Sequence, residues 1–543
     1  MVAGELVAIL HADTALSHPH FKGIPGRLKE LLEYKNAWED LGRSPIEKKR
    51  GLIENFFKEL TEQLIAYYIP VNIDLLSQEL AKTSVPEMQD YAIIVSLCNN
   101  IMSFMLTIGI PLRECNLLHS RILLNHVNSF DVRFDSWKDK VQVIEQDFTV
   151  RFSMENNKLY DMLTGRGQQT SFNGCTYNTY INSKNKKITD AEIMVRTFSV
   201  LAAKEKAEIM LKDSLDVVAY MLGSGNINKH QAFSVTNAAG QVVDVAGYSN
   251  EILTNSDRLT LDEFGHFMQA MSSLYSKSSL VSSRKCSAAF RFLRGGLATE
   301  TSEENRFSAY WSALESLTLG VSSENLDHDD HVNFTTPACM GFDYVVKQLI
   351  AIRGICKLLN IRPNLQDGTT VTPGTATLHE IFLYLKDTSF MSYIKHSMQE
   401  YPYPLFTIEK FASTCVLARD LGNKIISHEK KVSRHLYRLY ILRNAIAHNA
   451  ESNPYIVFLT ANLEHYLRGT INAMFYASTM TDAIDSPESA FQRYLDMHEV
   501  ALRSLEPTYG IEEKEHNSIK GMIVRGEITP SDELLRDWIK LHN

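Results

Sequence analysis

A run without any charged side chain, residues 91 to 112 (YAIIVSLCNNIMSFMLTIGIPL), most constrains how this chain folds. A run of this length and polarity forms either a transmembrane helix or a helix in the core of a bundle. Asn99 and Asn100 lie at its centre, and two amides at the middle of a bilayer are costly unless they find partners. The amides favour the core helix, so we expect a helical bundle and no membrane contact.

Length and composition indicate a globular protein of more than one domain. The chain has 543 residues, beyond the size at which a single core usually stops growing, so two or three domains are expected. Its seven cysteines include no CxxC pair, which is typical of reduced, intracellular thiols. The N-terminus lacks a basic segment and has only a short apolar run, which argues against a secretory signal. We therefore expect a cytoplasmic protein.

Helical periodicity dominates the first half of the chain. Segment 46 to 68 carries apolar residues on one helical face. Segment 233 to 245 (FSVTNAAGQVVDV) instead shows β-type residues on either side of a turn and predicts a hairpin. We find no internal repeat and no low-complexity tract. Further helices are predicted at 26 to 40, 86 to 108, 111 to 127, 186 to 222 and 341 to 360.

Helix start signals return in the second half. Thr301 with Glu304 and Thr377 with Glu380 have the spacing of capping boxes, each before an amphipathic run. The first of these helices is predicted to end at Gly320. Two long helices follow, at 428 to 449 and 456 to 479, separated by Pro454, which cannot continue a helix.

These patterns predict a mainly α fold in which a helical N-terminal region with a small β-hairpin insertion precedes a C-terminal helical bundle. We divide the chain into a helical domain (1–165), a mixed middle region with the hairpin (166–280) and a C-terminal domain with a tail (281–543). The middle region is predicted to sense or regulate.

Charge is unevenly distributed along the chain. The formal net charge of −9 does not favour nucleic-acid binding. Between residues 424 and 448, however, six cations oppose one acid, six minus one, which gives +5. The alternative interpretation is a solvated helix face. The cations are Lys424, Lys430, Lys431, Arg434, Arg438 and Arg443, and the acid is Glu429.

The segment LRNAIAHNA, residues 442 to 450, places Arg443 and His448 near the end of a predicted helix. On an α-helix they lie about 140° apart around the axis and roughly 7.5 Å apart along it. Arg443 could reach around the helix, or a second copy of the helix could bring its own pair alongside. Alanines at 445, 447 and 450 would allow such close approach, while the core-facing stripe is predicted to be Leu439, Leu442 and Ile446.

An arginine and a histidine at one phosphate suit RNA cleavage by the ribose 2′-OH. The guanidinium neutralises charge that develops on the phosphate, and the imidazole transfers a proton, so no metal is required. The alternative is a C-terminal helical turn that carries a cation and a histidine because the helix dipole favours them.

The hexapeptide RNAIAH (443 to 448) resembles the R-x4-6-H signature of HEPN-domain ribonucleases (higher eukaryotes and prokaryotes nucleotide-binding domains), including a polar residue after the arginine. HLYRLYILRNAIAHNA (435 to 450), preceded by ENRFSAYWSALESL (304 to 317), looks like the two best-preserved helices of the Apea-like HEPN proteins, which are associated with bacterial defence against phage. In that family a helix reading "alEsl" packs against the motif helix, and Glu315 holds the matching position. The resemblance covers about 281 to 505.

The resemblance implies that Arg443 and His448 are catalytic and that Asn444 orients them. It implies a helical HEPN bundle that dimerises to form a composite site, and metal-independent endonuclease activity without a cofactor, in antiphage defence by abortive infection. Because many HEPN proteins bind without cutting, the alternative is a non-catalytic module that binds a nucleotide or a partner in a toxin and antitoxin pair.

We expect RNA, with transfer RNA as one candidate, to contact the basic helix through Lys431, Arg434, Arg438 and Tyr440. Tyr440 could instead fill a helix interface. A homodimer or higher homo-oligomer and a phage-derived trigger are the expected partners, because a chain that destroys RNA must be held inactive.

Other motifs carry weaker signals. LDHDDH (326 to 331) contains metal-ligand types but is better explained as an acidic loop, since no distant ligand set is evident. TGRGQQT (164 to 170) and LGSGN (222 to 226) lack the GK[ST] of a P-loop. HADTALSHPH (11 to 20) matches no zinc spacing. Cys286 and Cys339 have no visible base partner, so we expect packed thiols and no metal site.

Overall fold

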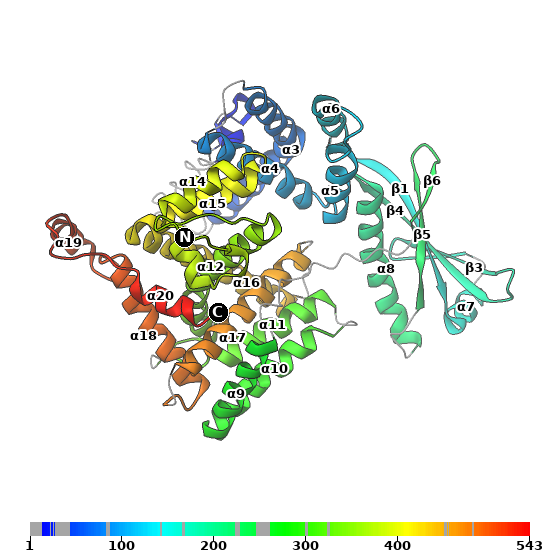
Figure 1. The fold of residues 1–543 in the computed structure, drawn as a ribbon. Helices are drawn as coiled ribbons and strands as arrows, with labels where there is room; N and C mark the ends of the chain where they lie inside the picture. The colour runs from blue at the N-terminus through cyan, green and yellow to red at the C-terminus, as the bar shows by residue number, and fades with distance from the viewer. Residues whose placement is uncertain are drawn as a thin grey trace. The chain divides into compact units, whose positions relative to one another are not determined.

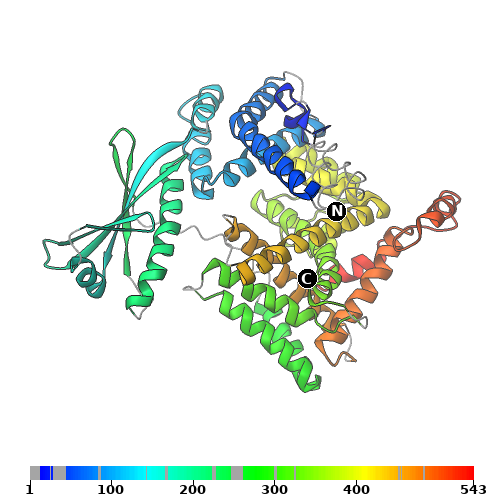
Figure 2. The same cartoon turned by 180° about the vertical axis from the view of Figure 1, so that it is seen from behind.

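The fold is seen in a computed structural model, in which most of the chain can be described (Figures 1 and 2). Two compact units, Met1–Glu251 and Ile252–Asn543, make up the chain. Helices predominate and the described residues form one small antiparallel sheet, which confirms the mainly α prediction. The described residues are 13–21, 23–24, 26–27, 44–82, 87–141, 144–165, 169–222, 228–245, 261–298, 302–322, 326–449, 453, 455–480 and 483–542.

The first unit begins with helices that share one hydrophobic core. The charge-free run forms α4, which packs against α3 through Leu97, Ile101 and Met105. Asn100 of α4 donates from Nδ2 to Asp13 Oδ1 and to Asn72 Oδ1, at 3.4 Å each. The helices are α3 (Ser44–Leu80), α4 (Met88–Thr107), α5 (Leu112–Leu118) and α6 (Phe130–Val141), and a π-helical turn (His119–Leu123) follows α5.

The outer face of α4 is polar. Among the described helices, α4 is the one whose length and hydropathy would suffice to cross a membrane. Its exposed positions include Ser96, Asn99, Ser103 and Thr107, which are spaced along one helical face. The run is therefore an amphipathic helix, with one amide on the polar face and one bonded to neighbours within the unit.

The sheet of the first unit has the strand order β2-β3-β4-β1-β5-β6, and all neighbours are antiparallel. α8 covers one of its faces (Figures 1 and 2), where Phe148, Val150 and Phe152 of β1 pack with Ala203, Ala207 and Leu211 of α8. Its elements are β1 (Gln146–Glu155), α7 (Asn157–Thr164), β2 (Gln169–Phe172), β3 (Cys175–Ile181), β4 (Lys187–Thr197), α8 (Val200–Leu222), β5 (Asn228–Asn237) and β6 (Val242–Val245).

The predicted hairpin is confirmed as β5 and β6, but it is part of a larger sheet than expected. A helix over 186 to 222 is wrong in its first third, because residues 187 to 197 form β4. That strand pairs with β1 on one side and β3 on the other, and these two ladders override a segment whose local pattern looked helical.

The second unit is helical and is built around one large hydrophobic core. The capping box of Thr377 and Glu380 is confirmed. The box of Thr301 and Glu304 is wrong by one residue, because the Ser302 hydroxyl caps the helix by accepting from Asn305 N at 3.3 Å. The helices are α9 (Leu261–Lys277), α10 (Leu280–Gly296), α11 (Glu303–Thr318), α12 (His328–Leu358), α13 (Leu378–Tyr384), α14 (Thr388–Ser397), α15 (Pro402–Val416), α16 (Ala418–Asn449), α17 (Ile456–Thr479), α18 (Pro487–Leu505), α19 (Glu513–Val524) and α20 (Glu533–Lys540).

Helix α16 is the element that carries the motif, and it begins ten residues before the predicted start at 428. It packs on α11, α12, α15 and α18. Leu439 is fully buried, and Leu442 and Ile446 are half-buried against the same core, as the predicted stripe requires. Pro454, Ala450, Thr301, most of 26 to 40 and residues 223 to 226 lie outside the described residues.

Candidate functional site

The guanidinium of Arg443 lies on the side of α16 that faces the bundle. Its Nη1 donates to Oδ1 of Asn444 at 3.0 Å, and its Nη2 lies 3.9 Å from Oε2 of Glu315 on α11. About a third of the Arg443 side chain remains exposed (32%), against 17% for Glu315. The arginine is therefore held in place by two neighbours while part of it still reaches solvent.

Glu315 is itself fixed by a buried tryptophan. Trp311, one helical turn earlier on α11, donates from Nε1 to Oε1 of Glu315 at 2.7 Å and is almost fully buried. The ring of Tyr440 on α16 packs against Trp311, with centroids 5.9 Å apart. This places Tyr440 at the contact between α11 and α16, half-buried, where it fills the helix interface.

His448 lies on the opposite side of α16 and is exposed. The 140° separation expected from helical geometry holds in the chain, because α16 remains helical through Asn449. Within the described part of the chain, neither a hydrogen bond nor an ion pair joins His448 to Arg443. One copy of the chain therefore presents the two side chains in different directions, with Asn444 half-buried between them.

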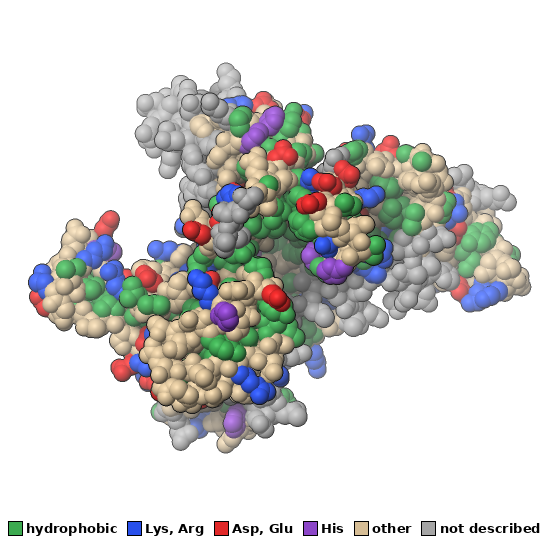
Figure 3. All heavy atoms as spheres, turned by 45° about the horizontal axis from the view of Figure 1, so that its top comes forward, with side chains coloured by type: hydrophobic (Ala, Val, Ile, Leu, Met, Phe, Trp, Pro, Cys, Tyr) green, Lys and Arg blue, Asp and Glu red, His purple; other side chains and the backbone are tan. Residues whose placement is uncertain are grey.

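The remaining predicted RNA-binding residues lie on exposed positions of α16. Lys431, Arg434 and Arg438 are all exposed. Glu429, the one acid of this basic segment, turns away from them, because its Oε1 lies 2.7 Å from Nε2 of the buried His498 on α18. These cations therefore form no ion pair with Glu429. On the face of the molecule drawn in Figure 3, by contrast, acidic and basic side chains lie among one another.

Two further histidines of α16 point into the bundle. His435 Nδ1 lies 2.8 Å from the hydroxyl of Tyr466 on α17, and the ring of His428 stacks on Tyr344 of α12 with centroids 4.9 Å apart. Burial lowers the pKa of both imidazoles. The charge of Arg438 lowers the pKa of His435 further, while around His428 the Asp343 carboxylate raises the pKa and nearby lysines lower it. Both are held as neutral rings that pack, so they are poor candidates for the catalytic proton carrier.

The other sequence candidates are structural where they can be described. In LDHDDH, Asp327 stands at the N-cap of α12 and the next acids occupy its first turn, where the helix dipole favours them. No group of three or more potential ligands in the described residues could hold a metal. Cys286 and Cys339 are buried, free thiols, and burial raises the pKa of each.

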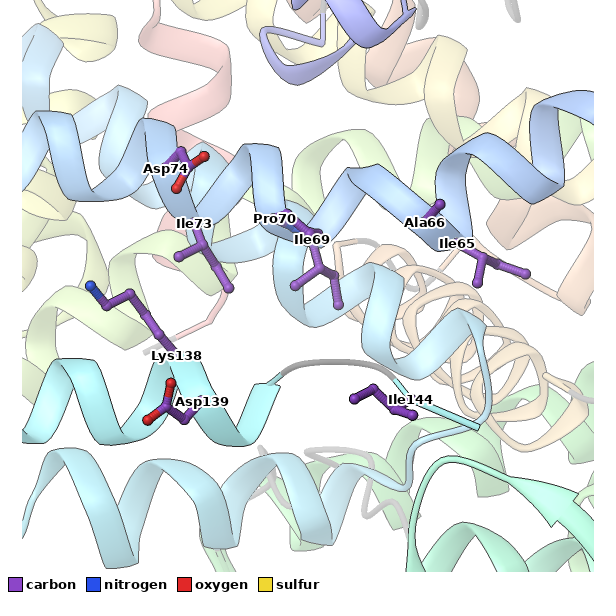
Figure 4. Close-up of a pocket in the computed structure, with 9 residues that line it drawn as sticks. All are labelled: Ile65, Ala66, Ile69, Pro70, Ile73, Asp74, Lys138, Asp139 and Ile144. Carbon is purple, nitrogen blue, oxygen red and sulfur yellow. The ribbon is translucent and has the colours of Figure 1, made fainter. Parts of the chain in front are cut away.

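A cleft of about 440 Å³ lies in the first unit between α3 and α6 (Figure 4). Ile65, Ile69 and Ile73 line it from α3, and Lys138 and Asp139 line it from α6. No residue of the predicted site lies near it in the sequence. Pro70 also lines the cleft; since proline has no N–H, the carbonyl of Ala66 loses its α-helical donor at the cleft wall.

Sequence reasoning missed the pairing of Glu429 with His498 and the Trp311 hydrogen bond that fixes Glu315. The pairing of Glu429 with His498 leaves no signal in local spacing, since it joins separate helices, whereas Trp311 and Glu315 have the i,i+4 spacing that places two side chains side by side on one helix. No model of a known protein family matches this chain, and no curated protein or solved structure shows significant similarity to it.

Proposed function

We propose that this chain is an endoribonuclease of the Apea-like HEPN type, with its second unit as the HEPN bundle. One observation carries the proposal: the two segments of the resemblance, on α11 and α16, lie against each other, and Glu315 faces Arg443 at 3.9 Å. These segments are more than a hundred residues apart in the chain. Chance similarity in two short motifs gives no reason for them to meet at the matching positions.

The proposed chemistry needs one phosphate, one cation and one proton carrier. His448 accepts the proton of a ribose 2′-OH, and the 2′ oxygen attacks the adjacent phosphorus. The bond from phosphorus to the 5′ oxygen breaks, that oxygen takes up a proton, and the products are a 2′,3′-cyclic phosphate and a 5′-OH. Arg443 stabilises the negative charge that develops on the phosphate oxygens, and Asn444 holds the guanidinium at 3.0 Å.

The geometry of α16 supports a site assembled from two copies of the chain. Because Arg443 and His448 point about 140° apart, we propose that Arg443 of one copy meets His448 of the other across a two-fold axis. The exposed alanine at 447 lets two such helices approach closely. The biological setting that we propose is antiphage defence by abortive infection in the cytoplasm, with a phage-derived trigger that gates the dimer and cellular RNA, including transfer RNA, as substrate.

The alternative is a non-catalytic HEPN module that binds a nucleotide or a partner protein. One observation favours it: Arg443 already contacts Glu315 and Asn444 within its own chain. A cation engaged in this way can serve to position α16 on α11. This alternative predicts binding without cleavage.

Incubation of the purified chain with total cellular RNA in EDTA tests the proposal. We expect fragments with cyclic phosphate termini, and we expect His448→Ala to abolish them. His396→Ala is a matched control, because His396 is also an exposed histidine in the last turn of a helix, α14. Cleavage by His448→Ala at the parental rate would overturn the catalytic assignment.

A further inference from the structure

A line of five basic residues runs along one side of α16, at 424, 428, 431, 435 and 438. Their spacing of four, three, four and three residues keeps them on one helical face. The two histidines of this line turn into the bundle, onto Tyr344 and Tyr466. The three cations stay outside, and we call Lys424, Lys431 and Arg438, together with Lys410 on the adjoining α15, the cationic strip.

The three lysines of the cationic strip are close enough to repel one another. Burial lowers the pKa of Lys424, and Lys431 and Lys410 lower it further through their charge. Lys410 and Lys431 are exposed and Lys424 is half-buried. Holding the three lysines close together costs electrostatic free energy, and a bound anion relieves this cost.

Two carboxylates on or beside this part of α16 form ion pairs with residues other than the lysines of the cationic strip. Glu429 pairs with His498, and Asp343 pairs with Lys347 at 2.9 Å. Over the ranges that the structure describes, no carboxylate forms an ion pair with Lys410, Lys424 or Lys431. The cationic strip therefore creates a region of positive electrostatic potential on a chain whose net charge is −9.

The geometry of the cationic strip matches a single phosphate backbone. Lys424, Lys431 and Arg438 stand seven residues apart, so they rise by about 10 Å each and together span about 21 Å along α16. Successive heptads drift by about 20° around the axis, which turns the strip toward the side of the helix where His448 lies. One row of cations follows one backbone, whereas a duplex would present two, and single strands also leave the 2′-OH free to adopt an attacking geometry.

We infer that the cationic strip binds the backbone of single-stranded RNA at a distance from the scissile bond. The inference rests on the proposed function, because it takes RNA as the substrate. Lys424 lies about 36 Å along α16 from His448, so the strip selects RNAs long enough to reach it. A short oligonucleotide that fills only the Arg443 and His448 site would lack these contacts.

The test measures RNA affinity against salt, in a His448→Ala background so that the RNA stays intact. A fluorescent single-stranded RNA is titrated with this protein and with versions that also carry Lys424→Gln and Lys431→Gln. Each lost phosphate contact lowers the steepness of log K against log salt by about 0.7, so the pair should lower it by about 1.4 and weaken affinity on the order of tenfold at low salt. Lys430→Gln is the matched control, since Lys430 is exposed and adjacent in sequence but lies about 100° around α16 from Lys431.

The outcomes separate this inference from the proposed function. If the double variant keeps the parental slope and affinity while the parent still cuts RNA through His448, RNA binding by the cationic strip is refuted and the proposed nuclease function is not. A loss in Lys430→Gln of half the size or more would also refute it, because Lys430→Gln removes one charge where the double variant removes two, and the effect would then be that of net charge. Absence of salt-dependent RNA binding by the parent would refute both proposals. Because glutamine is neutral and both sites are at least partly exposed, thermal unfolding should show that every variant folds.

Discussion

Two substitutions of Glu315 distinguish its contribution to the stability of the fold from its contribution, through Arg443, to RNA cleavage. Glu315→Gln keeps an oxygen that accepts from Trp311 Nε1 but removes the charge that faces Arg443. Glu315→Ala removes both. In the structure the Trp311 bond is 2.7 Å long and its donor ring is almost fully buried, whereas the Arg443 contact is 3.9 Å long and partly exposed.

These distances set the expected magnitudes. Loss of a partly exposed ion pair costs about 0.2 to 1 kcal/mol, so Glu315→Gln should lower the free energy of unfolding by no more than that. A buried Trp311 N–H left without an acceptor costs a further 1 to 3 kcal/mol or so in Glu315→Ala. For a unit of this size each kcal/mol lowers the melting temperature by about 2 to 4 °C, so the two variants should be distinguishable.

The assay pairs thermal or urea unfolding with RNA cleavage in EDTA. We expect Glu315→Gln to keep near-parental stability and to lose cleavage through a lower kcat, because the guanidinium is no longer held by charge. Parental kcat in Glu315→Gln would show that Glu315 does not position Arg443. Equal stability of the two variants would refute the role assigned to the Trp311 hydrogen bond.

The remaining predictions concern the fold and its titration. Leu439→Ala should lower the free energy of unfolding by about 2 to 5 kcal/mol in urea, since Leu439 is fully buried in α16; a loss below about 1 kcal/mol would mean that the core collapses around the site. Gly174→Ala should cost about 1 to 2 kcal/mol because Gly174 has a φ of +76°, and an unchanged urea midpoint would contradict the turn. Since burial lowers the pKa of His428 and His435, the unfolded chain takes up protons first, so stability should fall as pH drops through about 6.5. Replacing both histidines by glutamine should flatten the urea midpoint between pH 7 and pH 5; an equally steep fall would assign it to other groups.

The second unit was predictable in part, because several of its helices carry local start signals or apolar periodicity. Thr377 with Glu380 supplied a start signal, and apolar spacing around Leu439 gave the buried face of α16. The meeting of Glu315 with Arg443 was expected only through the resemblance, since nothing in the spacing of α11 and α16 fixes their register. The orientation of Tyr440 followed from packing on Trp311, which local sequence does not encode.

Most of the sheet was not predicted from the sequence, although one of its hairpins carries a clear local signal. Asn173 and Gly174 form a two-residue turn with φ of +49° and +76° between Phe172 and Cys175, and Asn-Gly is the strongest short-range signal for a hairpin. β4 is different, because its residues alternate only weakly in polarity; β3 pairs with one of its edges across a short loop, but β1, which pairs with the other edge, is distant in sequence. Non-local pairing of that kind outweighs local propensity.

The most direct test of the central claim mixes two inactive variants. If Arg443 of one copy and His448 of its partner act on the same phosphate, chains carrying Arg443→Ala and chains carrying His448→Ala should each fail to cut RNA alone. After unfolding and refolding together in equal amounts, half of the dimers contain both chains and one of their two sites is intact, so about a quarter of parental activity should return. Each variant retaining parental activity, or a refolded mixture as inactive as its components, would contradict the account.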